Sequence, residues 1–467
     1  MKTNTLTPWT SVLMLLLALQ AYSQAPRAKD SARKGSVFPA LSPDSIRLYQ
    51  VYVRNFSPQG TLQGVLQGLD RIQSLGCNTI WLMPVHPVGV LNRKGTFGSP
   101  YSVQNYRKIN PEFGTEADLK NLVTECHRRG MLLILDWVAN HTAFDHPWTR
   151  SNPDWYTRNA QGKILPPNDD WTDVADLNFD NPALRETMIQ EMEYWVKQCD
   201  VDGYRCDVAM MVPSDWWSAC IQRLRALKPL FMLAEANGPE FYRMGFNATY
   251  GWDFYHRLKE VFKGKSVQVL DSAWTVENQH TTDQAGTLPG RVMRFVTNHD
   301  ETSWDDVPVK VFGSPEASRA AYVLAQQPVS MPLVYNGQEV GQTLKQNIFE
   351  RSTVQYQRNP DMLAFYRQIG RILAEEPAYA GRKMQRLQAE DQDCWWSLRG
   401  EGEEAVLCVV NTRNQTLKSN VPSVVRRKSF VNLFDQSTAY LQDSFEIEPY
   451  GFRLFKPYKA LQPAPNP

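Results

Sequence analysis

The strongest constraint on the fold is an alternation of strand-like and helix-like segments that repeats along most of the chain. Apolar runs of strand length are separated by amphipathic runs with the helical period. Eight strands are predicted, at 48–53, 78–83, 131–135, within 202–209, and at 230–234, 246–250, 292–296 and 330–335. Such alternation implies a parallel sheet, and eight units predict a closed (β/α)₈ barrel, or TIM barrel.

The helical segments begin and end with recognisable signals. They are predicted at 64–75, from 116 through Arg129, at 182–199, from Ser214, at 316–326 and at about 361–374. Thr115 to Asp118 resembles a capping box, and Gly130 ends the helix that it opens. A doubly wound open sheet is the alternative, but no glycine-rich phosphate loop follows the first strand.

The barrel pattern does not cover the whole chain. We expect a signal peptide at 1–24, a lead-in at 25–43, the catalytic barrel at 44–380 with an insert after the third strand at 141–180, a C-terminal antiparallel β-sandwich domain at 381–457, and a tail at 458–467. The last domain is predicted because helical period disappears after residue 381 and short alternating runs lie between turn residues.

The N-terminus predicts export to the periplasm or medium. Lys2 precedes an apolar run at 12–19, and small residues follow at Ala21 and Ser23, so we expect cleavage near Ser23 or Ala25. That run is too short to span a bilayer, and we expect no membrane span after cleavage. The 50 basic and 49 acidic residues give no reason to expect nucleic acid as a partner. The seven cysteines lack CxxC spacing and are interpreted mostly as small buried residues.

Polar clusters stand where four predicted barrel strands end. They are Asp136-Trp137-Val138-Ala139-Asn140-His141, Arg205 with Asp207, Glu235, and Asn298-His299-Asp300. An Asp or Asn at one strand end often only caps the next turn. The carboxyl ends of barrel strands meet on one rim, however, so these acids and histidines together indicate a catalytic site. We expect the two histidines to be neutral hydrogen-bonding partners.

Side-chain alternation predicts how the fourth strand is used. Arg205 and Asp207 should share one face, and Tyr204, Cys206 and Val208 the other. An adjacent arginine lowers the pKa of a carboxyl and keeps it ionised, which suits Asp207 to nucleophilic attack. A structural ion pair would show the same spacing.

Two further acids complete a possible reaction site. Glu235 has apolar neighbours and a like charge nearby, and both favour a protonated carboxyl that can act as an acid. Asp300 remains to bind sugar hydroxyls and to stabilise a positive transition state. With Asp207 as attacker, this set matches double displacement at an acetal carbon.

These motifs resemble the signature regions of the α-amylase family of glycoside hydrolases. The resemblance rests on 136–141, 203–207, Glu235, 296–300, Val174-Ala175-Asp176-Leu177-Asn178, Gly98-Ser99-Pro100-Tyr101 and Val334-Tyr335-Asn336-Gly337-Gln338-Glu339. It covers nearly the whole mature chain. It implies a retaining reaction on α-linked glucose units, with Asp207 as nucleophile, Glu235 as acid/base and Asp300 as stabiliser.

The resemblance also implies binding residues. The central subsite would be shaped by Tyr101, His141, Arg205 and His299. A structural calcium ion would be held by Asn140, Asp176 and the backbone carbonyl of Met211, and no organic cofactor is implied. Many α-amylases carry Lys-His where this chain has Met210-Met211, but a carbonyl ligand survives that substitution.

The sequence therefore predicts an exported hydrolase of α-glucans or maltooligosaccharides that cleaves mainly α-1,4 bonds. A glucanotransferase, or a neopullulanase or cyclomaltodextrinase, is the alternative, because the same three acids serve all of them and Asp176-Leu177-Asn178 resembles the latter two. A non-catalytic glucan-binding protein is the alternative from another class. Relatives of that kind usually lose catalytic carboxylates, and here Asp207, Glu235 and Asp300 are all present.

Overall fold

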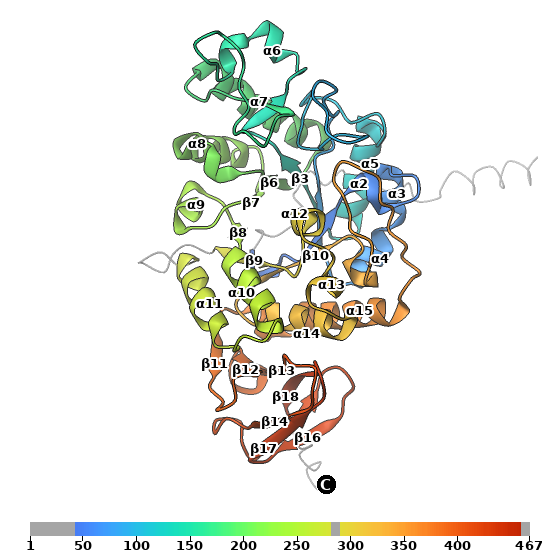
Figure 1. Cartoon of the computed structure of the whole chain (residues 1–467), viewed down its shortest axis with the longest axis vertical. Helices are drawn as coiled ribbons and strands as arrows, with labels where there is room; N and C mark the ends of the chain where they lie inside the picture. The colour runs from blue at the N-terminus through green and yellow to red at the C-terminus, as the bar shows by residue number, and fades with distance from the viewer. Residues whose placement is uncertain (1–42, 282–289, 459–467) are drawn as a thin grey trace, which may run out of the picture. The chain divides into compact units, whose positions relative to one another are not determined.

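The computed structural model describes residues 43–281 and 290–458, and its centre is a closed barrel of eight parallel strands (Figure 1). The barrel strands are β1 (Leu48–Val51), β2 (Thr79–Leu82), β3 (Leu132–Trp137), β6 (Gly203–Cys206), β7 (Phe231–Ala234), β8 (Ala248–Tyr250), β9 (Arg291–Arg294) and β10 (Met331–Tyr335). They follow one another in chain order around the barrel, and β10 pairs with β1 to close it. The predicted (β/α)₈ barrel is confirmed.

Helices surround the strands and cover their outer faces (Figure 1). The inner faces point into the closed barrel, whose interior is filled by side chains. The strands are almost entirely buried, which explains why most of their residues are apolar. The helices between and after the barrel strands are α2 (Val53–Phe56), α3 (Leu62–Gln67), α4 (Leu69–Ser74), α5 (Glu116–Arg128), α7 (Pro182–Cys199), α8 (Ser214–Arg225), α9 (Pro239–Met244), α10 (Trp252–Phe262), α11 (Val269–His280), α12 (His299–Trp304), α13 (Pro308–Val311), α14 (Pro315–Ala325), α15 (Pro360–Glu375) and α16 (Pro377–Ala380).

The helix-start signals act as predicted. The Thr115 side chain accepts the N–H of Asp118, and the Asp118 side chain accepts the N–H of Thr115, so α5 opens with a capping box. Asn181 caps α7 by accepting the N–H groups of the second and third helical residues, with Pro182 in the first position.

One predicted helix is divided. The single helix expected at 64–75 is two short helices, α3 and α4, which meet at Gly68. The ring of Phe56 packs against this glycine so closely that an added Cβ would lie 2.5 Å from its Cζ atom. The break therefore accommodates a buried aromatic ring, which the local pattern does not reveal.

The insert after β3 is present. Its strands β4 (His141–Ala143) and β5 (Val174–Asp176) pair in antiparallel register, with His141 opposite Asp176. The short helix α6 (Trp148–Ser151) lies between them in the chain. The insert places Trp171 beside the barrel, with its ring centroid 5.5 Å from that of His141.

The predicted C-terminal antiparallel β-domain is also confirmed. A six-stranded sheet has the order β11 (Met384–Leu387), β12 (Cys394–Arg399), β13 (Val406–Asn411), β18 (Phe452–Pro457), β15 (Lys428–Asn432) and β16 (Thr438–Leu441), and a second sheet pairs β14 (Leu417–Asn420) with β17 (Ser444–Ile447). Side chains from both sheets, including Trp396, Phe430 and Ile447, share one apolar core.

All seven cysteines lie within the described residues, where they are buried and form no disulfide, as expected for small core residues. The predicted signal peptide and most of the predicted lead-in and tail lie outside the described residues. None of the helices within 43–281 and 290–458 has the length and hydropathy of a membrane span.

Candidate active site

Asp207 and Glu235 follow the carboxyl ends of two neighbouring barrel strands, β6 and β7. The N–H of Asp207 donates to the carbonyl of Trp137 over 2.9 Å, and the N–H of Glu235 donates to that of Cys206 over 3.0 Å. The parallel hydrogen-bond ladder thus continues one residue beyond each strand. Both carboxyl groups are thereby fixed at the end of the barrel where catalytic sites of this fold are built.

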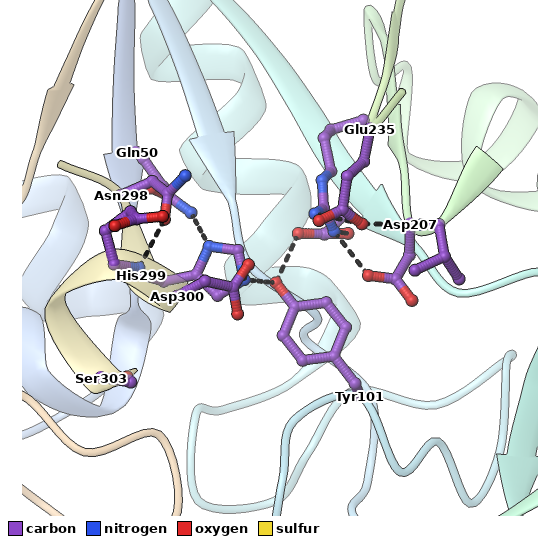
Figure 2. Close-up of polar contacts among 12 residues, drawn as sticks. Gln50, Tyr101, Asp207, Glu235, Asn298, His299, Asp300 and Ser303 are labelled. Atoms are coloured by element: carbon purple, nitrogen blue, oxygen red, sulfur yellow. Dashed lines mark hydrogen bonds and ion pairs between the residues drawn. The ribbon is translucent and has the colours of Figure 1, made fainter. Parts of the chain in front are cut away.

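Asp300 reaches the same rim from the turn that follows β9. There the Asn298 side chain accepts the N–H of Glu301 over 2.9 Å and begins α12, so His299 and Asp300 occupy its first positions. Figure 2 shows Asp207 and Glu235 on one side of the site and His299 and Asp300 on the other, with Tyr101 between them.

Arg205 is fully buried and joins three carboxylates. Its Nη1 donates to Oδ1 of Asp136 and to Oδ1 of Asp207, each over 2.8 Å, and its Nη2 lies 2.8 Å from Oε2 of Glu235. The Nε group donates to the hydroxyl of Tyr250 over 3.0 Å. The sequence predicted a pair of Arg205 with Asp207 alone, whereas the guanidinium contacts carboxyl groups from three neighbouring strands.

The surroundings of Asp207 overturn the predicted direction of its pKa shift. Burial raises the pKa of Asp207 well above its usual value, and the nearby charges of Glu235, Asp136 and Asp300 raise it further. Arg205 opposes this rise but does not reverse its direction. The prediction of a lowered pKa was wrong because the effect of burial, together with the neighbouring acids, outweighs that of Arg205.

The pKa values of Asp136 and Asp300 are raised in the same way. Burial raises the pKa of Asp136 to about 6 although Arg205 lies beside it. Burial, followed by the charge of Glu235, raises the pKa of Asp300 to about 7. Asp136, Asp207 and Asp300 therefore all bind protons more readily than isolated carboxyl groups do.

Val208 departs from the predicted alternation. The strand ends at Cys206, and Val208 has φ 35° and ψ 48° in the left-handed region. Its side chain consequently lines the cavity together with Asp207 instead of facing the opposite side. Its N–H donates to Oε2 of Glu235 over 2.7 Å, so the unusual backbone orients a group that the sequence placed on the next strand.

Tyr101 and His299 form a hydrogen-bonded pair at the centre of the site. The Tyr101 hydroxyl lies 2.6 Å from Nε2 of His299 and donates to Oδ2 of Asp136 over 3.1 Å, and the two rings stack with centroids 5.2 Å apart. The side-chain amide of Gln50 lies 2.7 Å from Nδ1 of His299 (Figure 2). These contacts hold the tyrosine ring on the cavity wall.

Both histidines are neutral, as predicted. Burial lowers the pKa of His141 to about 3, and burial together with the charge of Arg205 lowers that of His299 well below its usual value. A neutral ring can donate from one nitrogen and accept at the other. The site can thus offer hydrogen bonds to hydroxyl groups without adding positive charge.

The residues expected to hold calcium do not form a convincing ion site. Asn140 and Asp176 are brought next to each other, because Leu177 donates its N–H to the Asn140 carbonyl over 3.1 Å. The amide of Asn140 lies 3.3 Å from Nδ1 of His141, and burial raises the pKa of Asp176. Calcium takes about six to eight oxygen ligands, and the described residues contain no group of three acidic, histidine or cysteine side chains that could hold a metal. Asn140, Asp176 and the carbonyl expected from Met211 give fewer oxygen ligands than calcium takes, so this donor set does not fit calcium.

The site opens into a cavity of about 610 Å³. Its catalytic end is lined by Tyr101, His141, Asp207, Glu235, His299 and Asp300. Trp171, Trp304 and Phe349 line other parts of the wall. The cavity thus combines carboxyl groups with aromatic surfaces, and it has the size of sites that enclose small-molecule ligands.

Several contributing residues were not assigned roles from the sequence. Asp136 is opposite Arg205 in the register of β3 and β6, and its place at the head of a polar cluster could have indicated this contact. Gln50, Trp171 and Lys94 carried no local signal. The ammonium of Lys94 lies 3.1 Å from Oδ1 of Asp173 and so ties the loop after β2 to the insert.

Comparison with known proteins gives consistent matches. Residues 26–371 match the family model described as "Alpha amylase, catalytic domain". The chain is 27% identical over 335 residues to Alpha-amylase 3 of Dictyoglomus thermophilum. The aligned part covers 63% of this chain and 63% of that relative, so the chain spans less than two thirds of the relative's length.

Two solved structures are similar over most of their length. An α-amylase from Lactobacillus plantarum matches with a TM-score of 0.80 and 29% identity, covering 89% of this chain and 99% of the other. A noncanonic maltogenic α-amylase from Thermotoga neapolitana also matches with a TM-score of 0.80, at 26% identity, covering 90% and 100%.

Proposed function

Because the chain belongs to the α-amylase family of glycoside hydrolases, we propose that it hydrolyses α-glucosidic bonds, mainly α-1,4, in starch-type glucans or maltooligosaccharides. The observation that carries this proposal is the placement of Asp207, Glu235 and Asp300 around one cavity, with the first two on the same guanidinium. That contact keeps an attacking carboxylate and a proton donor close to one anomeric carbon, as double displacement requires.

In the first step, a carboxylate oxygen of Asp207 forms a bond to the anomeric carbon while the bond to the leaving oxygen breaks. Glu235 gives its proton to that oxygen, so the leaving sugar departs as an alcohol. Because burial raises the pKa of Asp207, we infer that Asp207 first passes its proton to a neighbouring acid of the cluster and then attacks as the carboxylate. The proton that Glu235 gives to the leaving oxygen can be the one that Asp207 released.

In the second step, Glu235 removes a proton from water, and the water oxygen replaces Asp207 at the anomeric carbon with overall retention of configuration. Asp300 and the neutral His141 and His299 bind sugar hydroxyls and hold the ring in place. Tyr101 presents an apolar ring face to the sugar at the cleaved bond.

The test is the hydrolysis of maltoheptaose, followed by proton NMR of the fresh product. The α anomer should appear first, and the Asp207→Asn variant should remain folded while its turnover falls by about 10³-fold or more. Initial release of the β anomer would contradict double displacement. Unchanged turnover in Asp207→Asn would remove Asp207 from the role of nucleophile.

A cyclomaltodextrinase-like or glucan-transferring activity is the second candidate. It is favoured by the Asp176-Leu177-Asn178 segment and by the likeness to a structure described as a maltogenic α-amylase. The product pattern on starch, pullulan and cyclodextrin separates these possibilities, and products longer than the donor would indicate transfer.

We also propose that the enzyme is exported, on the basis of the charged, apolar and small-residue pattern at 1–24. N-terminal sequencing of the mature protein would test this. Export predicts a new N-terminus near Ser23 or Ala25, whereas an intact Met1 on cytoplasmic protein would contradict it.

A further inference from the structure

Trp304 is the last residue of α12 and has an unusual environment for its size. Its side chain is 67% exposed, the largest value among the large apolar residues of the described chain. It also lines the catalytic cavity, beside Phe349 and Ile348. Isolated apolar residues on a surface need no explanation, but Trp304 continues the wall of a cavity that contains the catalytic acids.

The helix fixes the relation of Trp304 to the reaction centre. Asp300 and Trp304 are four residues apart in α12, so they project from the same face about one turn, or about 6 Å, apart. Figure 2 shows Asp300 and Ser303 on this helix. Trp304 therefore lines the cavity about one helical turn from Asp300, a separation comparable with the length of one sugar unit.

Neighbouring contacts hold this surface in place. Ser303 donates its hydroxyl to the carbonyl of Gln346 over 2.8 Å, and the ammonium of Lys345 donates to the carbonyl of Trp304 over 3.3 Å. The ring of Phe349 meets the indole at 70° with centroids 6.1 Å apart. The indole and Phe349 thus form an apolar corner that is anchored to the segment after β10.

We propose that Trp304, supported by Phe349, is a binding platform for a glucose unit that lies outside the unit at the cleaved bond. This inference rests on the proposed function. The face of a glucose ring that carries C–H groups is apolar, and it packs on an aromatic ring while the hydroxyl groups at its edge remain in water. The open side of Trp304 leaves room for such stacking, and the platform favours substrates long enough to reach it.

The test compares Trp304→Ala with the wild type on maltoheptaose and on the shortest maltooligosaccharide that the wild type cleaves. The ratio kcat/KM for maltoheptaose should fall by about tenfold, through a higher KM with kcat unchanged. For the short substrate it should change little. Trp304→Phe should restore most of the loss, because it returns an aromatic face.

Tyr440→Ala provides a matched control, because Tyr440 is also exposed, at 57%, but lies on β16 of the C-terminal domain. The Tyr440→Ala substitution should leave kcat/KM unchanged for both substrates. Calorimetric titration of maltoheptaose into Glu235→Gln, with and without Trp304→Ala, measures the same loss as a change in Kd without turnover.

The outcomes separate the two proposals. If the wild type neither cleaves nor binds any α-glucan, the proposed function is wrong, and the proposed platform is wrong with it. If the wild type cleaves maltoheptaose but Trp304→Ala affects long and short substrates equally, or affects neither, only the platform is overturned. The same holds if Tyr440→Ala reproduces the loss.

Discussion

The backbone N–H of Val208 donates to Oε2 of Glu235 over 2.7 Å. This bond joins the turn after β6 to the carboxyl group at the end of β7, and so connects the proposed nucleophile strand with the proposed acid. It depends on a left-handed backbone, φ 35° and ψ 48°, at a β-branched residue. Such a conformation costs on the order of 1–3 kcal/mol and is found mainly where function requires it.

We expect Val208→Gly to raise the free energy of unfolding by about 1 kcal/mol, because glycine adopts a positive φ without strain although it loses more backbone entropy. The turnover number should fall several-fold, because a more mobile backbone holds Glu235 less firmly. Urea unfolding and steady-state kinetics measure the two effects, with Val208→Ala between the two proteins. A glycine variant that is less stable and fully active would contradict this account.

Glu235→Ala should slow cleavage of maltoheptaose by about 10²–10⁴-fold in kcat/KM. An α-maltosyl fluoride, whose leaving group needs no proton, should lose much less, because kcat/KM reports formation of the glycosyl-enzyme. In Asp207→Asn the value of kcat/KM should fall by a similar factor for both substrates, because both react with the same nucleophile. Equal losses for both substrates in Glu235→Ala would argue against its role as acid.

Asp136→Asn should destabilise the fold by about 1–3 kcal/mol, because it weakens one charge-assisted hydrogen bond of the buried Arg205, which keeps Asp207 and Glu235 as partners. It should also lower kcat on the order of 10²-fold, because Arg205 no longer holds Asp207 and Glu235 in the same geometry. Glu277→Gln is the matched control, since it breaks the buried pair with Arg294 away from the cavity. It should reduce stability alone. A similar loss of turnover in both variants would show that general destabilisation explains the effect.

The raised pKa of Asp300, about 7, predicts a pH dependence of stability. In the unfolded chain its pKa is about 3.9, so between about pH 4 and about pH 7 the folded state binds more protons than the unfolded state. This group therefore makes the folded state less stable as the pH rises through that window. The unfolding free energy of the wild type minus that of Asp300→Asn should fall from about pH 4 to about pH 7 and then level off. Urea unfolding across this range would measure it, and a difference that rises with pH would be inconsistent with the proposed burial.

Chelation should leave the melting temperature and kcat unchanged, because Asn140, Asp176 and the carbonyl of Met211 give fewer oxygen ligands than calcium takes. Lys94 instead ties the insert to the barrel, through Asp173 and through the carbonyl of Asp170 at 2.6 Å. Lys94→Met should raise the KM for maltoheptaose several-fold, because Trp171 next to these residues becomes less firmly placed.

Lys383→Met is the control for that substitution, since Lys383 pairs with Glu401 on an exposed surface, where ion pairs contribute little. Loss of activity on chelation that calcium alone restores would instead establish a calcium site.

The barrel and the location of the site could be predicted because they depend on local periodicity and on order along the chain. Strand β7 is a short apolar run, and β6 mixes β-forming residues with a glycine. Asp207 and Glu235 stand just after these two strands. Since all eight strands are parallel, residues at their carboxyl ends meet on one rim, independently of the conformations of the loops. The capping signals at Thr115 and Asn181 were equally local, and they located α5 and α7.

The break at Gly68 and the direction of Val208 could not be predicted in this way. The first depends on the ring of Phe56, which is distant in sequence from the helix period that it interrupts. The second depends on a backbone conformation that no propensity assigns to valine. In both cases a tertiary contact overrides the local preference.

The sequence by itself determined which acids and histidines this protein brings to the end of its barrel, because the order of parallel strands follows from the pattern of residues. Only the tertiary structure decided their charges. Arg205 is shared among Asp136, Asp207 and Glu235, and the cluster is buried. A pKa depends on desolvation and on every charge within a few ångströms, and those neighbours are contributed by strands that meet only when the barrel closes.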